Sequence, residues 1–300
     1  MSPRGRIRRL PNLLIFGFGY TGQALARRLR GKGWDVWAAV RSEASADAAR
    51  EAGVTPIQTT DQAALIAAPP MNAILVTAPP DDHGCPALAA LVPAMARAGA
   101  FPDWIGYLST TGVYGDRDGR WAFETTPLSA RSPEAARRVA AERDWLEVGR
   151  GMGLTVQVFR LPGIYGPGRS TFDRLREGRS RNLVKPGQVF SRIHVEDIAS
   201  ALEASIARPH AGRAYNLCDD EPAPPHVLNA FACALMGAEP PPTVPYDETA
   251  LPPMARRFWS ENKRVSNARA KAELGWRPAF ASWREGLSAI YAQEKSGDET

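Results

Sequence analysis

Residues Leu13–Leu29 read LLIFGFGYTGQALARRL, which places three glycines within six positions between an apolar run and a segment with helical spacing. Gly17, Gly19 and Gly22 match the pattern G-x-G-x-x-G directly between a predicted strand and a predicted helix. The first glycine would permit the turn out of the strand, the second the approach of a pyrophosphate, and the third close packing of the helix on the strand. A phosphate would bind the free N–H groups at the helix start near Thr21. The stretch therefore predicts a dinucleotide site, and the alternative is a glycine-rich turn without a ligand.

Apolar runs alternate with segments of helical spacing through the first half of the chain. The predicted strands are residues 13–16, 36–40, 73–76, 104–108 and 156–159, and the predicted helices include 23–30, 87–98 and 134–148. Such alternation is typical of a mostly parallel sheet with helices on both faces. The expected fold class is therefore α/β, a Rossmann-type doubly wound parallel sheet with a smaller C-terminal substrate lobe.

The character of the chain changes after about residue 167, where prolines gather and the alternation becomes irregular. A smaller domain built from loops and a few helices is typical of such a composition. We expect a disordered basic arm at 1–11 and a dinucleotide-binding Rossmann domain at 12–166, to which 188–216 returns. Residues 167–187 and 217–300 are expected to form the substrate-binding lobe.

The composition is that of a soluble globular protein, with 44% hydrophobic and 23% charged residues among 300. The formal net charge is +5, but the arginines are spread through Ala-rich stretches, so we expect no nucleic-acid partner. No apolar stretch is long enough for a membrane span or has the form of a secretion signal, so we expect a cytoplasmic protein without a membrane partner. Cys85, Cys218 and Cys233 lie far apart and outside ligand spacing, which indicates neither a disulfide framework nor a metal site.

The residues after the second predicted strand bear on the choice between NAD and NADP. A carboxylate at the tip of that strand would accept hydrogen bonds from a ribose 2′-hydroxyl, whereas an arginine would pair with a 2′-phosphate. Asp35 stands at the beginning of the strand, at the wrong edge of the sheet, while Arg41 and Ser42 stand at the ligand edge. We therefore favour NADP(H) as the cofactor. NAD(H) is the alternative, in which Glu43 would be the acid.

Six motifs follow one another along the chain. After the glycine motif come YLSTTGVYGD (107–116), FRLPGIYGPGR (159–169), SRIHVEDIA (191–199), YNLCDDEP (215–222) and ELGWRPAF (273–280). In this order they resemble the extended and atypical short-chain dehydrogenases/reductases, in particular the NAD(P)-dependent epimerase/dehydratase-like group. The resemblance covers nearly the whole chain. It implies a dinucleotide along the carboxyl edge of the sheet, a small-molecule substrate between the two lobes, and a homodimer.

The cofactor-binding residues are expected in the glycine loop and at the ends of the strands that follow it. The segment 77–79 directly follows the predicted strand 73–76, and the resemblance implies that it passes beside the ribose of the cofactor. The full expected set is Gly17, Phe18, Gly19, Tyr20, Thr21, Gly22, Arg41, Ser42, Thr77, Ala78, Pro79, Ser109 and Leu161.

The chemistry of the family implies a Ser or Thr, a Tyr and a Lys in the active site, of which this chain keeps only the first. Thr110 occupies the hydroxyl position, but alignment on Glu142 puts Glu134 where the Tyr would stand and Arg138 where the Lys would stand. Three interpretations are open. Glu134 exchanges the proton, with Arg138 on the ribose hydroxyls or a carboxylate; or Tyr114 or Tyr165 reaches the site; or the site has lost redox chemistry. The structural alternative is a surface ion pair between Glu134 and Arg138.

Arginines near the predicted cleft suit recognition of a carboxylate or phosphate. The expected substrate-binding residues are Thr111, Tyr114, Arg160, Tyr165, Arg169 and Arg192. His194 is expected to pack at the junction of the lobes, and Trp121 either lines the site or holds a loop. The sequence thus predicts an NADP(H)-dependent oxidoreductase or epimerase/dehydratase-like enzyme that transfers hydride to or from a small hydroxylated metabolite, with an anionic group as one option. The alternative is a non-catalytic NADP(H)-binding redox sensor.

Overall fold

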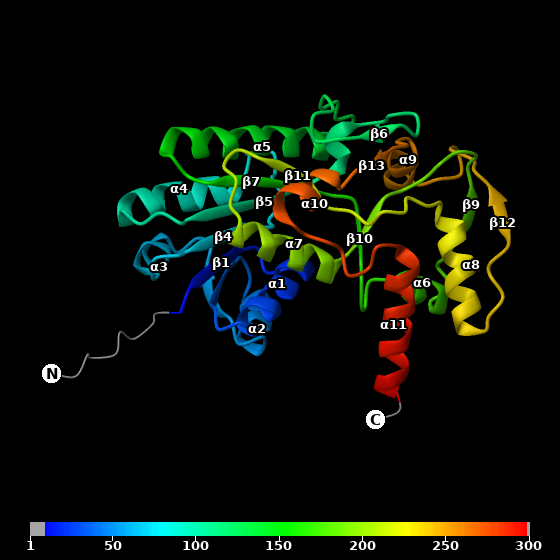
Figure 1. Ribbon diagram of the computed structural model, residues 1–300, viewed down its shortest axis with the longest axis horizontal. Coiled ribbons are helices and arrows are strands. Elements are labelled where there is room, and N and C mark those ends of the chain that lie inside the picture. Colours follow the sequence, from blue (N-terminus) through cyan, green and yellow to red (C-terminus); the bar gives the residue numbers. More distant parts are fainter. Residues whose placement is uncertain (1–9, 299–300) are drawn as a thin grey trace.

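A seven-stranded parallel sheet lies at the centre of the computed structural model, which describes residues 10–298 (Figure 1). The strands are β1 (Asn12–Phe16), β2 (Asp35–Val40), β3 (Thr55–Gln58), β4 (Ala73–Val76), β5 (Trp104–Thr110), β7 (Val156–Leu161) and β11 (Ala214–Asn216). Their order is β11-β7-β5-β4-β1-β2-β3, and every neighbouring pair is parallel. The strand order therefore reverses between β1 and β4, and in open parallel sheets ligands bind at such a point, outside the carboxyl ends of the strands.

Two helical layers cover this sheet because side chains of successive strand residues point to opposite faces. Leu13 and Ile15 of β1 pack into one core and Leu14 and Phe16 into the other. The first core is covered by α1 (Tyr20–Arg30), α2 (Glu43–Glu51), α7 (Val195–Ala207) and α10 (Ala268–Leu274). The second is covered by α3 (Gln62–Ala67), α4 (Pro86–Ala98) and α5 (Pro133–Met152). The predicted α/β doubly wound class is confirmed.

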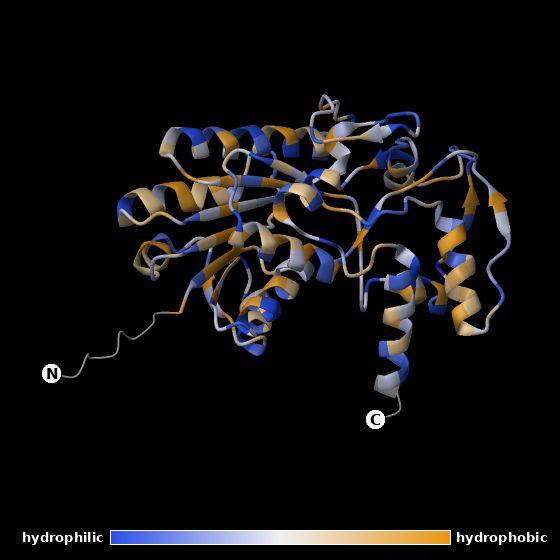
Figure 2. Cartoon of the chain, viewed as in Figure 1, coloured by the Kyte–Doolittle hydropathy of each residue, from blue (hydrophilic) through white to orange (hydrophobic). Residues whose placement is uncertain are grey.

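The second lobe has a small core of its own, formed around Phe172, Leu228, Trp283 and Leu287. Its elements are α6 (Thr171–Arg176), β9 (Asn182–Val184), α8 (Pro225–Met236), β12 (Thr243–Pro245), α9 (Pro253–Trp259) and α11 (Trp283–Asp298), which lie on the right in Figure 1. In Figure 2 the ribbon of α8 is mostly apolar, whereas α5 alternates between polar and apolar turns.

Short elements connect the two parts. β8 (Gly163–Tyr165) pairs with β10 (Arg192–His194), β6 (Trp121–Ala122) pairs with β13 (Arg264–Val265), and η1 (Thr111–Tyr114) follows β5. Although α10 lies within the expected substrate lobe, it packs on α7 and β11 of the main sheet. The chain thus returns to the first core once more than the predicted domain boundaries include. Of the basic arm expected at 1–11, residues 1–9 lie outside the described range.

The expected elements of the first domain did not include α2, β3 and α3, nor the short η1, β6 and β8. β3 reads TPIQ and buries only Ile57, so it has no apolar run to mark it as a strand. α3 is six residues long and buries only Leu65. Within residues 10–298, no helix has both the length and the apolar character needed to cross a membrane.

Candidate functional site

The glycine loop between β1 and α1 has three different spatial requirements. Gly17 has a φ of +95°, and a Cβ there would lie 2.7 Å from Thr77 Oγ1. A Cβ at Gly22 would lie 3.0 Å from Ile15 Cγ2, so the helix could not pack as closely on its strand. Gly19 is exposed, and a Cβ there would meet no heavy atom within 4 Å. Two glycines are thus required by the protein itself, while the third borders open space.

The start of α1 has no side-chain cap. Gly19 is its N-cap residue and offers no side-chain oxygen, so the first N–H groups of the helix have no cap. This end lies at the carboxyl edge of the sheet, where the strand order reverses. Thr77 and Ala78 run beside it, because their backbone N–H groups donate to Phe16 O at 2.9 and 3.1 Å. A pyrophosphate would match both the helix dipole and the bare backbone here.

Two charged residues follow the end of β2, Arg41 and Glu43, and they differ in whether the protein already engages their side chains. Arg41 is exposed and makes no ion pair or side-chain hydrogen bond with any described residue. Glu43, by contrast, accepts from Arg50 Nη1 at 2.7 Å and from Gln58 Nε2 at 3.4 Å. Ser42 is the N-cap of α2 and accepts from Ser45 N at 3.3 Å. The arginine is therefore available to a ligand, and the acid is already engaged.

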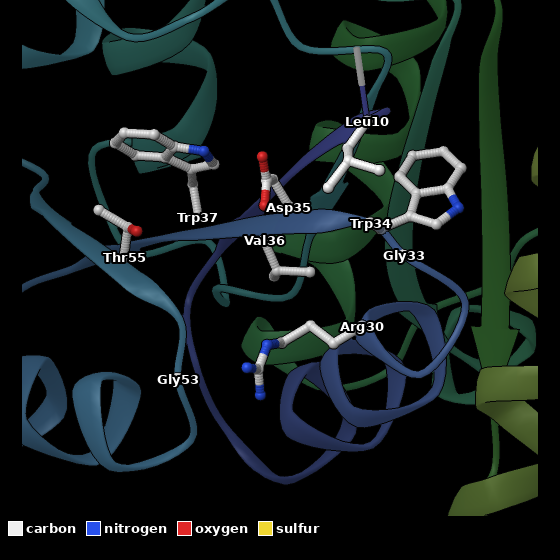
Figure 3. A pocket seen from close by; sticks show the side chains of 9 residues that line it. All are labelled: Leu10, Arg30, Gly33, Trp34, Asp35, Val36, Trp37, Gly53 and Thr55. Carbon is white, nitrogen blue, oxygen red and sulfur yellow. The ribbon is translucent and has the colours of Figure 1, made fainter. Parts of the chain in front are cut away.

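A hollow of about 390 Å³ lies at the opposite end of β2 (Figure 3). Asp35 and Trp37 project from one face of the strand, while Val36 and Arg30 lie on the other (Figure 3). Asp35 is the first residue of β2 and so stands at the amino edge of the sheet. Ligands of open parallel sheets bind outside the carboxyl ends, so this hollow is separate from the predicted dinucleotide site.

Thr110 ends β5 at the carboxyl edge of the sheet, and its Oγ1 accepts a hydrogen bond from Gly112 N at 3.1 Å. Glu134 lies in the first turn of α5, largely exposed, and pairs with Arg257 at 3.6 Å. Its own backbone N–H, Ser132 and Arg257 hold the pKa of its carboxyl below the usual value. Arg138 lies one turn further along and donates to Leu108 O at 2.6 Å and Tyr107 OH at 3.3 Å. Glu134 and Arg138 thus have other partners instead of pairing with each other.

A buried network engages several residues that the sequence assigned to ligands. Arg160 is only 6% exposed and donates to both carboxylate oxygens of Glu142, with the shortest contact at 2.7 Å. Ser109 donates its hydroxyl proton to the same carboxylate. Tyr114 is fully buried, accepts from Arg160 at 3.0 Å and donates to Asn216 Oδ1 at 2.7 Å. In the sequence Glu142 served only to align the motif, so its role as the partner of Arg160 was missed.

Of the other expected substrate residues, Thr111 and Tyr165 are buried, whereas Arg169 is exposed. Thr111 is buried in η1, and Tyr165 is buried beneath α11, since a Cβ at Gly286 would lie 2.1 Å from the Tyr165 hydroxyl. Burial raises the pKa of Tyr165 above its usual value. Arg169 lies over the ring of Tyr20, with 5.8 Å from its guanidinium carbon to the ring centroid. Tyr20 in turn donates to Pro167 O at 2.9 Å, which joins the glycine loop to the segment 166–169.

His194 lies at the junction of the lobes. Its ring contacts Tyr165 edge-on with 5.2 Å between centroids and Phe280 with 4.4 Å. Its Nδ1 accepts from Glu196 N at 3.3 Å and thereby caps α7. Burial lowers its pKa to about 4. The imidazole is therefore neutral at pH 7, caps the start of α7 and packs between the rings of Tyr165 and Phe280.

The variant His194→Gln tests this assignment through its pH dependence. Because the folded chain holds His194 with a pKa of about 4 against a usual 6.5, the unfolded chain binds the proton first as pH falls. The stabilisation from neutral His194 is therefore present above pH 6.5 and is lost toward pH 4, by up to roughly 3 kcal/mol. We expect the difference in unfolding free energy between wild type and variant, measured in urea, to shrink from pH 7 to pH 4. A constant difference would contradict the buried neutral imidazole.

The chain is similar to one protein family and to several curated proteins. The profile of the NAD dependent epimerase/dehydratase family matches residues 87–218. Protein YeeZ of Escherichia coli strain K12 is 30% identical over 247 residues, which cover 77% of this chain and 86% of that protein. A 3-diazoavenalumate denitrifying reductase of a Streptomyces species is 30% identical over 182 residues, 55% of this chain and 57% of the reductase.

Solved structures resemble the fold over nearly its full length. A functionally unknown conserved protein from Silicibacter pomeroyi DSS has a TM-score of 0.85 at 46% identity, covering 95% of this chain and 99% of that one. UDP-glucose 4-epimerase of Thermotoga maritima, solved with UDP-glucose, has a TM-score of 0.78 at 17% identity and covers 95% and 99%. dTDP-glucose 4,6-dehydratase of Bacillus anthracis strain Ames, in complex with NAD, has a TM-score of 0.75 at 18% identity and covers 96% and 98%. At such low identity the last two bear on the fold alone.

Proposed function

Because the chain belongs to the NAD-dependent epimerase/dehydratase family, we propose that it is an NADP(H)-dependent oxidoreductase that transfers hydride between nicotinamide and a small, anionic substrate. The observation that carries this proposal is the uncapped start of α1 beside the open space at Gly19. Nothing in the fold requires the bare backbone at position 19, whereas a pyrophosphate does. Gly17–Gly22 and Thr77–Pro79 would hold the dinucleotide along the carboxyl edge of the sheet.

The preference for NADP(H) rests on the tip of β2. The guanidinium of Arg41 is available and could pair with a 2′-phosphate, while the carboxylate of Glu43 is held by Arg50. We expect Arg41→Ala to weaken NADPH binding about 10-fold or more and NADH binding less than about 2-fold, as measured by calorimetry. Glu43→Ala is the matched control and should alter neither affinity. Equal losses for both nucleotides in Arg41→Ala would remove the proposed 2′-phosphate contact.

When bound, the nicotinamide supplies or accepts the hydride, and the chain supplies orientation. Thr110 would donate its hydroxyl hydrogen to the substrate oxygen, and the unused N–H groups of Arg138 would hold the ribose hydroxyls. Glu134 is exposed with a lowered pKa, so it is ionised at neutral pH and a poor proton donor. We therefore propose that solvent water exchanges the proton at this open edge. The name of the Streptomyces relative, a denitrifying reductase, supports a reductive role for this site.

The same observation on Glu134 favours a second candidate, an NADP(H)-binding sensor without turnover. Tyr114 and Tyr165, the other candidates for a proton donor, are both buried and their pKa values are raised by burial. A protein without a positioned acid could still change conformation with the redox state of its cofactor. Both candidates predict binding, and only turnover separates them.

The test begins with calorimetric titration of the purified chain with NADPH and with NADH, after a denatured sample has been checked for retained nucleotide. Micromolar NADPH binding and weaker NADH binding would support the site. Oxidation of NADPH would then be followed with aldehydes, ketones and nucleotide sugars as acceptors. Binding without any turnover would favour the sensor, and no binding at millimolar concentration would refute both. A homodimer is proposed as well, and its mass in solution can be measured by light scattering.

A further inference from the structure

We propose that the cleft contains a subsite for a flat, carboxylate-bearing substrate, in which Arg192 binds the carboxylate and Phe190 and Phe258 cover the flat group. This inference rests on the proposed function, because the subsite would hold the substrate of the hydride transfer. It concerns residues of the second lobe and the strand pair that leads into it.

The guanidinium of Arg192 is fixed by backbone carbonyls and has no acidic partner among the described residues. Its Nη1 donates to Phe190 O and Ala223 O, each at 2.8 Å, and it makes no ion pair with any residue of 10–298. Burial lowers its pKa to about 10, so it remains charged at neutral pH. The neighbouring acid, Asp219, is 3% exposed, burial raises its pKa to about 8, and it forms no ion pair with a described residue. The guanidinium is thus partly buried and held by two carbonyls but lacks an ion pair within the described chain, and a substrate carboxylate would supply one.

An aromatic surface lies beside this cation. Phe190 and Phe258 stack with 4.4 Å between ring centroids and 9° between planes. Phe258 is 55% exposed, the largest exposed fraction among the large hydrophobic side chains of the described residues. Trp259 packs edge-on against Phe190 at 5.4 Å, and its carbonyl accepts from Lys185 Nζ at 2.7 Å, which fixes the end of α9. An exposed stacked ring held in this way can stack on a flat ligand.

The cation and the aromatic surface face the same space. Phe190 and Arg192 are two residues apart at the extended approach to β10, so their side chains lie on the same side of that segment. Arg192 pairs in register with Gly163 of β8, where a Cβ would lie 3.8 Å from Arg192 Cγ, so the aliphatic part of its side chain runs along the bare backbone of β8.

This space adjoins the proposed reaction centre. Gly163 comes two residues after Leu161, which pairs with Thr110 at the carboxyl edge of the sheet. From the other side, α9 reaches α5 through the contact between Arg257 and Glu134 at 3.6 Å. A planar acid bound on Arg192 and Phe258 would therefore extend toward Thr110.

The test uses 2-naphthoate as the probe and the full chain, titrated by calorimetry with and without saturating NADP⁺. We expect 2-naphthoate to bind, and 2-naphthamide and cyclohexanecarboxylate each to bind at least about 10-fold more weakly. Phe258→Ala should weaken 2-naphthoate about 5- to 10-fold. The control Phe101→Ala removes another half-exposed ring, in the loop before β5 at the amino edge of the sheet, and should change nothing.

The outcomes separate this inference from the proposed function. If 2-naphthoate does not bind, if the amide binds equally well, or if Phe258→Ala binds like wild type, the subsite is refuted whether or not NADPH binds. If NADPH fails to bind while 2-naphthoate binding depends on Phe258, the subsite stands and the proposed function fails. Unchanged NADPH affinity and melting temperature in Phe258→Ala would show that the loss arises at the subsite.

Discussion

The variant Gly19→Trp is expected to lose NADPH affinity by at least about 100-fold while keeping the melting temperature of the wild type. Gly19 has a φ of −91°, which any residue adopts, and a Cβ there would meet no heavy atom within 4 Å. The variant protein would therefore fold without backbone strain. The indole side chain would fill the space in front of the first N–H groups of α1. Calorimetry with NADPH gives the affinity, and differential scanning fluorimetry gives the melting temperature.

Gly151 offers a matched control for this variant. It lies exposed near the end of α5, and a Cβ there would likewise meet no heavy atom within 4 Å. Gly151→Trp should keep both the fold and the NADPH affinity, which separates the effect of an added indole from the effect of its position. If Gly19→Trp bound NADPH like wild type, the phosphates could not lie at the start of α1, and the proposal of a dinucleotide crevice would fail.

The glycine loop was predictable from sequence because its requirements are local. The positive φ of Gly17, the packing of Gly22 on Ile15 and the open space at Gly19 arise within one strand, one turn and one helix, whereas the contact of Gly17 with Thr77 comes from another strand end. The position of Arg41 followed from the same reasoning, since a parallel sheet places the end of each strand at the ligand edge. Motifs of this kind depend on the backbone conformation of a few consecutive residues, and the residue types at those positions are enough to predict it.

The partners of long side chains were not predictable in this way. The sequence predicts that Arg160 lines the cleft. In the structure its side chain binds Glu142 of α5, and the hydrogen-bond network continues through Tyr114 to Asn216 of β11. Phe190 and Phe258 lie 68 positions apart and come together only through the second lobe. Such contacts depend on the tertiary packing of several elements, so a residue type near a predicted cleft does not reveal which way its side chain points.

The second large effect is expected at the buried ion pair. Arg160→Met should lower the free energy of unfolding by about 3–5 kcal/mol, because it leaves the Glu142 carboxylate buried without its cation. The two side chains are 7% and 3% exposed, and the pair is bidentate, with its shortest contact at 2.7 Å. Methionine fills much of the same volume, so the loss reports the charge more than a cavity. Urea unfolding at pH 7 measures it.

The double variant Arg160→Met/Glu142→Gln distinguishes an unpaired charge from lost packing. The amide removes the charge and can still accept the hydrogen bond from Ser109, so we expect it to recover a large part of the loss. Arg143→Ala, which breaks the exposed pair of Arg143 with Asp144, should leave the melting temperature unchanged. If the double variant were no more stable than Arg160→Met, the contacts of the guanidinium with Tyr114 and Glu124 would account for the loss instead. Recovery would mean that Arg160 serves to neutralise Glu142 and is not available to an anionic substrate.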